Sequence, residues 1–251
     1  KAGNYEDCKD CDLIIITAGR NRKPGETRLD LIAGNSAILK NVVDQMKPHY
    51  TKGVIMIVSN PVDVLVYQCT KWMGLPNGMV FGTGCILDSS RFTRLIADYT
   101  RLNTEVVKAT IVGEHGDAQI PIWSRVSIAG VPIQEYCENV GLRWGENIRK
   151  DISDKVREMG ATIIKGKGRT HYGIATCVCY LAEAVLNQRL TIAPVSTMFQ
   201  GEYGIEDVCL SVPSIIGVNG VEKRLEERWA EEEFLAFRQA AEKMRNVLKT
   251  L

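Results

Sequence analysis

Short apolar runs alternate with longer helical patterns in the first third of the chain, and this alternation limits the possible folds more than any other feature. Strand-length apolar runs occupy Leu13–Thr17, Gly53–Ser59 and Met79–Phe81. Helices are predicted from about Thr27 to Met46, from Pro61 onward and from Asp88 onward. Strands that alternate with helices indicate an α/β fold with a parallel sheet.

The pattern changes after about Arg101. Strands of a mixed or antiparallel sheet are expected over Val106–Val112, Arg125–Ile128, Pro194–Phe199 and Asp207–Ile216. Long helices are expected over Trp144–Ile164, Gly173–Leu186 and Glu231–Leu251. We therefore expect two domains, an α/β domain over residues 1–85 and an α+β domain over residues 86–251.

Composition excludes several classes of function. The chain has 251 residues with 31 basic and 30 acidic side chains, a net charge of +1, and no long run of one sign. Nucleic-acid and membrane-surface binding therefore gain no support, and no apolar run approaches the roughly 20 residues of a membrane helix. Of the eight cysteines, Cys8 and Cys11 form a CxxC without a second ligand pair. We expect free thiols in a cytoplasmic protein and no metal site.

Four short motifs stand at expected strand or helix ends, where α/β enzymes keep their sites. They are A-G-R-N-R-K-P-G-E-T-R (18–28), S-N-P (59–61), D-S-S-R (88–91) and G-E-H-G-D (113–117). Taken alone, His115 would be an ordinary loop residue, Asp88 a helix N-cap, and Arg28 and Arg91 surface cations. Their occurrence together and in this order points to a site.

Together these motifs resemble the lactate/malate dehydrogenase family, and the similarity runs from Gly3 to Leu251 without an evident gap. The resemblance implies an oxidoreductase that transfers hydride between NAD and a small L-2-hydroxy acid or 2-oxo acid. It also implies a homodimer or homotetramer. Residues 1–85 would be the C-terminal half of the NAD-binding Rossmann domain, and residues 86–251 the catalytic domain.

The resemblance also implies the catalytic roles. His115 matches the residue that exchanges a proton with the substrate oxygen, a task that suits a group titrating near neutrality. Asp88 matches the carboxylate that orients this imidazole and favours its protonated form. Arg91 matches the arginine that binds the substrate carboxylate with two parallel hydrogen bonds. Arg28 matches the arginine that polarises the reacting carbonyl, and residues 20–26 would form a lid.

The remaining site residues are implied in the same way. Asn60 and Thr170 would contact substrate. The residues implied at the cofactor are Ala18, Gly19, Ser59, Asn60 and Ile174. Packing in the helix core is an equally good interpretation of Ile174.

The sequence departs from the family in lacking a G-x-G-x-x-G. Gly82-Thr83-Gly84 is followed by Leu87 where a third Gly or Ala is required. Residues 1–85 supply the last three of roughly six parallel strands, so a segment on the order of 70 residues is expected to be missing before them. We expect this chain by itself to bind NAD weakly or not at all, because the pyrophosphate would lose its glycine-rich turn.

Arg22 bears on the substrate. Aligning on P-G-E-T-R places it where most lactate dehydrogenases have Gln and malate dehydrogenases have Arg. A second substrate carboxylate buried under the lid needs such a partner, so malate/oxaloacetate is favoured. Lactate/pyruvate is the alternative, because P-G-E-T-R-L-D-L and Thr170 look more like the lactate branch. From another class, an inactive fragment or interaction module that lacks the NAD-binding loop also remains open.

Overall fold

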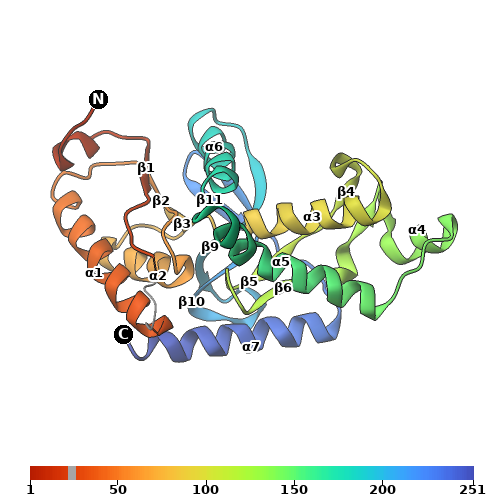
Figure 1. Cartoon of the computed structure of the whole chain (residues 1–251). Helices are drawn as coiled ribbons and strands as arrows, with labels where there is room; N and C mark the ends of the chain where they lie inside the picture. Colours follow the sequence, from red (N-terminus) through yellow and green to blue (C-terminus); the bar gives the residue numbers. More distant parts are fainter. Residues whose placement is uncertain (22–26) are drawn as a thin grey trace.

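The computed structural model describes residues 1–21 and 27–251, with the backbone alone for Arg28. Figure 1 shows the arrangement of its elements. The first half holds η1 (Tyr5–Cys8), β1 (Leu13–Ile16), α1 (Arg28–Met46), β2 (Val54–Ile57), α2 (Val62–Met73), β3 (Val80–Gly82), α3 (Ile86–Thr100), η2 (Thr104–Val106), β4 (Val107–Lys108), β5 (Ile111–Gly113) and β6 (Gln119–Pro121). The second half holds η3 (Trp123–Arg125), β7 (Ser127–Ile128), β8 (Val131–Pro132), α4 (Ile133–Val140), α5 (Glu146–Lys167), α6 (Tyr172–Leu186), β9 (Thr191–Gln200), η4 (Glu202–Gly204), β10 (Glu206–Gly217), β11 (Gly220–Arg224) and α7 (Glu231–Leu248).

One sheet runs through most of the molecule. β1, β2 and β3 are parallel, as the alternating sequence pattern predicts. The sheet continues in the order β1-β2-β3-β9-β10-β5-β6, with β11 paired to β10. β3 meets β9 in antiparallel fashion at Gly82 and Ser196, so the sheet crosses the expected domain boundary without a break. No gap in the sheet marks the expected domain boundary at residue 85, so the division into two domains stays a prediction.

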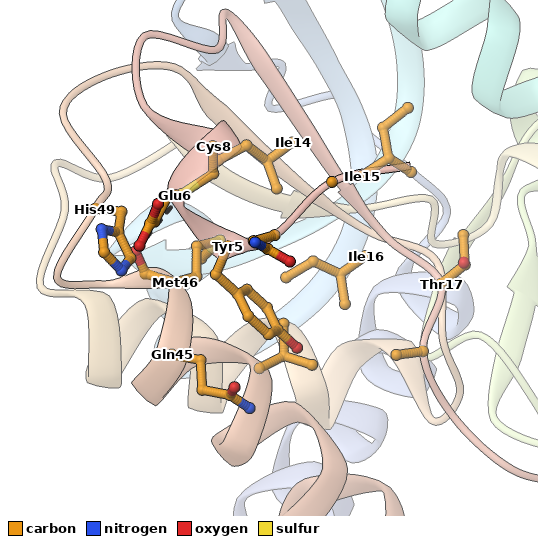
Figure 2. A pocket seen from close by; sticks show the side chains of 14 residues that line it. Tyr5, Glu6, Cys8, Ile14, Ile15, Ile16, Thr17, Gln45, Met46 and His49 are labelled. Carbon is orange, nitrogen blue, oxygen red and sulfur yellow. Dashed lines mark hydrogen bonds between the residues drawn. The ribbon is translucent and has the colours of Figure 1, made fainter. Parts of the chain in front are cut away.

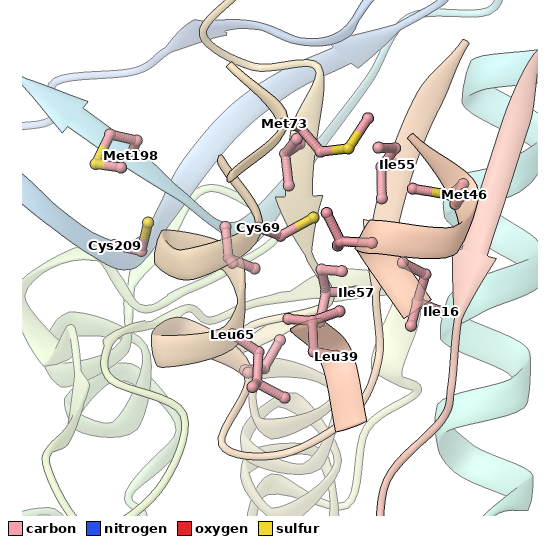
Figure 3. Packing of buried hydrophobic residues seen from close by; sticks show 14 residues of the cluster. Ile16, Leu39, Met46, Ile55, Ile57, Leu65, Cys69, Met73, Met198 and Cys209 are labelled. Carbon is pink, nitrogen blue, oxygen red and sulfur yellow. The ribbon is translucent and has the colours of Figure 1, made fainter. Parts of the chain in front are cut away.

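Both faces of β2 and β3 are covered, which explains why their sequences are apolar without interruption, whereas β1 is partly exposed. Because side chains alternate along a strand, Ile55 and Ile57 pack with Leu39 of α1 and Leu65 of α2 (Figure 3). Val54 and Met56 face the other way and pack with Leu181 and neighbouring residues of α6. The carboxyl ends of β1 and β2 are therefore held rigidly between helices.

The C-terminal helix supports the other end of the sheet. α7 runs along β10, β5 and β6 (Figure 1), and its Phe237 and Met244 share a buried cluster with Val112 of β5. No described helix combines the length and the apolar character needed to cross a membrane.

Several expected elements differ in detail. The helix expected from Asp88 begins two residues earlier, at Ile86, with Cys85 as N-cap, so Asp88 lies in its first turn and is not the cap. The strand expected over Val106–Val112 is two strands, because β4 pairs with β7 in a small separate sheet whereas β5 pairs with β10 in the main one. The strand expected over Arg125–Ile128 shortens to β7, since residues 123–125 form the turn η3.

Candidate active site

His115 lies in the loop between β5 and β6. The strand ends at Gly113, whose backbone φ of +91° lies in the left-handed region that favours glycine. An added Cβ there would come within 3.1 Å of the Ala118 carbonyl oxygen and of the Ile120 side chain. The backbone N–H of His115 donates to Oδ2 of Asp63 on α2 at 2.8 Å. The loop is thus shaped by a glycine and tied to a neighbouring helix.

Asp88 joins the imidazole of His115 to the guanidinium of Arg91. Its Oδ2 lies 2.6 Å from Nδ1 of His115, and its Oδ1 lies 3.3 Å from Nη1 of Arg91. The Asp88 side chain is only 4% exposed, so these contacts are little weakened by water. With Nδ1 engaged by Oδ2 of Asp88, Nε2 is the ring nitrogen that remains to exchange a proton with a ligand.

The electrostatics of this cluster favour a protonated His115. Burial lowers the pKa of His115, but the hydrogen bond and negative charge of Asp88 and the charge of Asp63 outweigh that effect. Arg91 opposes the increase, and the net result is a pKa above the ordinary value for histidine. His115 therefore keeps its proton to higher pH than an ordinary histidine does, which suits a proton donor.

Arg91 lies one helical turn after Asp88 and is largely buried, with 12% of its side chain exposed. The contact with Asp88 uses one of the N–H donors of a guanidinium, and a planar fork of this kind binds a carboxylate well. Gly160 of α5 lies opposite, where an added Cβ would come 4.0 Å from Nη1 of Arg91. Gly160 therefore lies within van der Waals reach of the Arg91 guanidinium.

A second group of predicted residues gathers after β1 and β2. Ser59 donates its hydroxyl hydrogen to the Ala18 carbonyl oxygen at 2.6 Å, which ties the two strand ends together. There is little room for a side chain at position 19, because a Cβ added to Gly19 would lie 3.3 Å from Cβ of Ser59. Asn60 precedes Pro61 through a cis peptide bond, and its Oδ1 accepts from the backbone N–H of Val62 at 3.3 Å. Within residues 1–21 and 27–251, no hydrogen-bond acceptor contacts the amide nitrogen of Asn60, so this group can donate to a ligand.

Asn35 connects both loops. This α1 residue is 2% exposed, and its Oδ1 accepts from the backbone N–H of Arg20 at 2.8 Å. Its Nδ2 donates to the carbonyl oxygens of Arg20, at 3.1 Å, and of Asn60, at 2.6 Å. Asn35 therefore fixes the backbone of Arg20 relative to that of Asn60.

The other predicted residues are placed less closely. Arg22 lies outside the described residues, and of Arg28 only the backbone is described, as the first residue of α1. Thr170 is exposed just before α6, and Ile174 in the first turn of α6 packs against the buried cluster that includes Ile86 of α3. The start of α6 thus lies beside the start of α3, the helix that carries Asp88.

A cavity of about 1000 Å³ runs along β1 and leads towards the second group. Figure 2 shows Glu6 and His49 at one end and Thr17 at the other, and Ala18 belongs to its lining. Ile15 of β1, which is 40% exposed, also lines it. Small residues at 18 and 19 beside an open cavity fit a cofactor that approaches the backbone closely.

Two residues of the site were missed in the sequence. Asp63 was overlooked because an acidic residue in the first turn of a helix is explained by the helix dipole alone. Asn35 carried a usable signal, since it shares a helical face with the buried Ile32 and Leu39. A polar residue on an apolar face requires buried hydrogen-bond partners.

Comparison with known families decides the relationship. Residues 1–82 match the NAD binding domain of lactate/malate dehydrogenase, and residues 85–251 match the alpha/beta C-terminal domain of the same family. The chain belongs to the lactate/malate dehydrogenase family. The resemblance expected from the motifs is thereby confirmed, as are the α/β fold with its partly parallel Rossmann-type sheet and NAD as the cofactor.

Individual relatives agree over almost the whole chain. An L-lactate dehydrogenase of Thermoanaerobacterium saccharolyticum is 42% identical over 100% of this chain and 80% of its own length. One of Acetivibrio thermocellus is 38% identical over 99% and 78%. The solved structure of a minor L-lactate dehydrogenase from Enterococcus mundtii, in a ligand-bound form, superposes with a TM-score of 0.94 at 38% identity, covering 99% of this chain and 79% of the other.

Proposed function

We propose that this protein is an NAD-dependent dehydrogenase that interconverts a small L-2-hydroxy acid and its 2-oxo acid. The observation that carries the proposal is the cluster in which Asp88 contacts both His115, at 2.6 Å, and Arg91, at 3.3 Å. A proton donor and a carboxylate-binding cation are thereby held on one buried carboxylate. A 2-oxo acid presents a carboxylate next to a carbonyl and needs both groups.

Each side chain has a defined task in the reduction. Arg91 binds the substrate carboxylate and fixes the position of the neighbouring carbonyl. His115 donates a proton to the carbonyl oxygen, and Asp88 holds the imidazole in the required tautomer and stabilises its charge. Asn60 donates a hydrogen bond near the same oxygen. Bound NAD supplies the hydride in reduction, as NADH, and accepts it in oxidation.

The remaining roles follow the family resemblance. Arg28 polarises the carbonyl, Thr170 lines the substrate pocket, and Ile174 provides an apolar surface beside the cofactor. Ala18, Gly19 and Ser59 form the close approach to the cofactor, supported by the contact between Ser59 and Ala18 and the lack of room around Gly19.

The substrate we propose is pyruvate, with L-lactate as its reduced partner. Relatives about 40% identical along this chain are L-lactate dehydrogenases, which supports lactate above malate and reverses the preference derived from Arg22. Malate/oxaloacetate remains the second candidate on one observation. Arg22 is suited to pair with a second carboxylate, and pyruvate would leave this charge without that partner.

Kinetics with both acids test the choice. We expect kcat/KM for pyruvate to exceed that for oxaloacetate at saturating NADH. Arg22→Gln should shift the ratio further towards pyruvate, by roughly tenfold or more if Arg22 meets the substrate side chain. Lys23→Gln removes a charge from the same segment and serves as the matched control, which should leave the ratio unchanged.

Other outcomes would change the assignment. A preference for oxaloacetate that Arg22→Gln reverses would establish malate/oxaloacetate in place of lactate/pyruvate. If neither acid supports oxidation of NADH, the proposed function fails, and the inactive fragment or interaction module becomes the better description.

We further propose a cytoplasmic homo-oligomer, a dimer or tetramer. Its eight free cysteines favour a reducing compartment. Apolar side chains at the end of α6 and around the start of β9 favour self-association, since Leu186, Leu190 and Ile192 are 53%, 62% and 57% exposed.

A further inference from the structure

Asp63 is a buried carboxylate beside the catalytic loop that the proposed reaction does not use. It is the second residue of α2 and is only 1% exposed. An acidic residue in a first helical turn is usually solvated, where it interacts with the positive end of the helix dipole. Burial of a charge is costly unless specific partners compensate it, so a purely local role does not explain Asp63.

The partner of Asp63 is remote in sequence and central to the site. Its Oδ2 accepts a hydrogen bond from the backbone N–H of His115 at 2.8 Å, across 52 residues. α2 begins directly after Asn60 and Pro61, so the same helix start carries both the tether to His115 and a residue proposed to contact the substrate oxygen. The tether therefore sets the position of His115 relative to Asn60.

The charge of Asp63 also acts on the imidazole. From α3, Asp88 contacts the ring and raises its pKa while the charge of Arg91 lowers it, and from α2 the charge of Asp63 raises it. Glu114 and Asp117 flank it on its own loop. Cys85, at the N-cap of α3, contacts the Gly113 carbonyl oxygen at 3.7 Å, and burial raises the pKa of its thiol well above the ordinary value, which keeps it neutral.

We propose that Asp63 is a positioning residue for His115, which fixes the backbone of the catalytic loop and whose buried negative charge favours the protonated imidazole. The inference rests on the proposed role of His115 as proton donor. It adds a second carboxylate to the one that contacts the ring, and the two act differently. Asp88 orients the imidazole directly, whereas Asp63 holds its backbone and acts on the ring only through its charge. The direction of the His115 pKa shift agrees, because the charge of Asp63 raises it.

Two substitutions separate the effect of the hydrogen bond to the His115 backbone from the effect of the Asp63 charge. Asp63→Asn keeps an oxygen that can accept from the His115 N–H but removes the charge. Asp63→Ala removes both. Glu135→Gln is the matched control, because it neutralises an exposed carboxylate in the first turn of another helix, α4.

The decisive measurement is an NMR titration of the histidine side chains. The chain has only three histidines, His49, His115 and His171, so the His115 signal can be assigned with a His115→Asn variant. We expect Asp63→Asn to move the His115 midpoint to lower pH, since the charged form loses a favourable interaction. Glu135→Gln should leave the midpoint in place. This titration needs neither substrate nor turnover.

Kinetics add a second readout. Reduction requires protonated His115, so the pH at which kcat/KM for pyruvate falls should move down in Asp63→Asn together with the NMR midpoint. Asp63→Ala should in addition lower kcat, because the loop loses its tether, while KM for NADH stays unchanged. Absence of pyruvate and oxaloacetate reduction in the parent protein would refute the proposed function but leave the titration result intact.

The proposal is overturned if Asp63→Asn and Glu135→Gln both keep the parent midpoint of His115. If Asp63→Asn does not fold, Asp63→Glu provides the test, because it retains the charge and must keep the parent midpoint. A large downward movement of the midpoint in a folded Asp63→Glu protein would equally overturn the role assigned to the charge.

Discussion

At the residue scale, the chemistry is concentrated on one carboxylate. Asp88 is almost fully buried and contacts two side chains that carry or can carry a positive charge, His115 and Arg91. A buried carboxylate with two such partners is compensated in a way that a lone one is not. In the proposed reaction, the same arrangement would keep His115 ready to donate a proton and hold Arg91 in a fixed orientation for the substrate.

This arrangement predicts the pH dependence of the reaction. Because Asp88 and Asp63 raise the pKa of His115, the imidazolium persists to higher pH than in an isolated histidine. Reduction of the 2-oxo acid should be lost as pH rises through this raised pKa, whereas oxidation of the hydroxy acid, which needs neutral His115, should appear there. In Asp88→Asn, the pH at which reduction is lost should be lower than in the parent protein. We also expect kcat/KM to decrease by roughly tenfold or more.

Steady-state pH profiles of kcat/KM in both directions check this prediction. Asp98→Asn is the control, because Asp98 lies on the same helix but is exposed and paired with Arg94 at 2.9 Å. If the pH profiles of Asp88→Asn equalled those of the parent protein, the group whose titration controls the reaction would not be His115.

Among the site residues, those that follow the end of a strand were the most predictable from the sequence. His115, Asn60 and Ala18 lie two or three residues after the ends of β5, β2 and β1, and an apolar run in the sequence indicates a strand. Asp63 was missed because its partner is a backbone N–H 52 residues away, which no local pattern records. Arg22 and the side chain of Arg28 lie outside the described residues, so their roles stay predictions.

At the element scale, the parallel strands and long helices were predictable because each satisfies one periodicity. Gly53–Ser59 predicted β2, and the apolar spacing after Thr27 predicted α1, for which Thr27 is the N-cap. Of the short elements, β3 was predicted from Met79–Phe81, but others were not. β11 has the sequence G-V-E-K-R, in which three charged residues follow a single valine, so no apolar run indicates a strand. It forms because it pairs with β10. Pairing of this kind is a tertiary effect.

The connection between α1 and the two loops at the site gives a prediction at this scale. Asn35→Ala removes three hydrogen bonds to the backbone of Arg20 and Asn60. Leaving such buried groups without partners should lower the free energy of unfolding by about 1–3 kcal/mol. It should also raise KM for the 2-oxo acid, since both the start of the lid segment and Asn60 lose their shared support.

Chemical denaturation and steady-state kinetics measure the two effects. Asn41→Ala on the same helix is the control, because Asn41 is exposed and its side chain contacts Gln45. Equal stability losses in the two variants would show that Asn35 contributes nothing beyond an ordinary surface amide.

At the scale of the whole molecule, one continuous sheet brings the two halves of the site together. β1 and β2 carry Ala18, Ser59 and Asn60 at their carboxyl ends, and β5, four strands further along the sheet order from β2, carries the loop of His115. α3 connects these parts, since Ser89 contacts the backbone N–H of Ile111 in β5 at 2.9 Å. Residues far apart in the chain thus form a single site.

The central claim is that His115 donates the proton when a 2-oxo acid is reduced by NADH. The most direct measurement is the rate at which NADH absorbance falls on adding pyruvate or oxaloacetate, at saturating NADH, in the parent protein and in His115→Gln. We predict oxidation of NADH that depends on the 2-oxo acid, and a loss of kcat of roughly 10²–10⁴-fold in the variant. No such oxidation in the parent protein, or an undiminished rate in His115→Gln, would contradict the account.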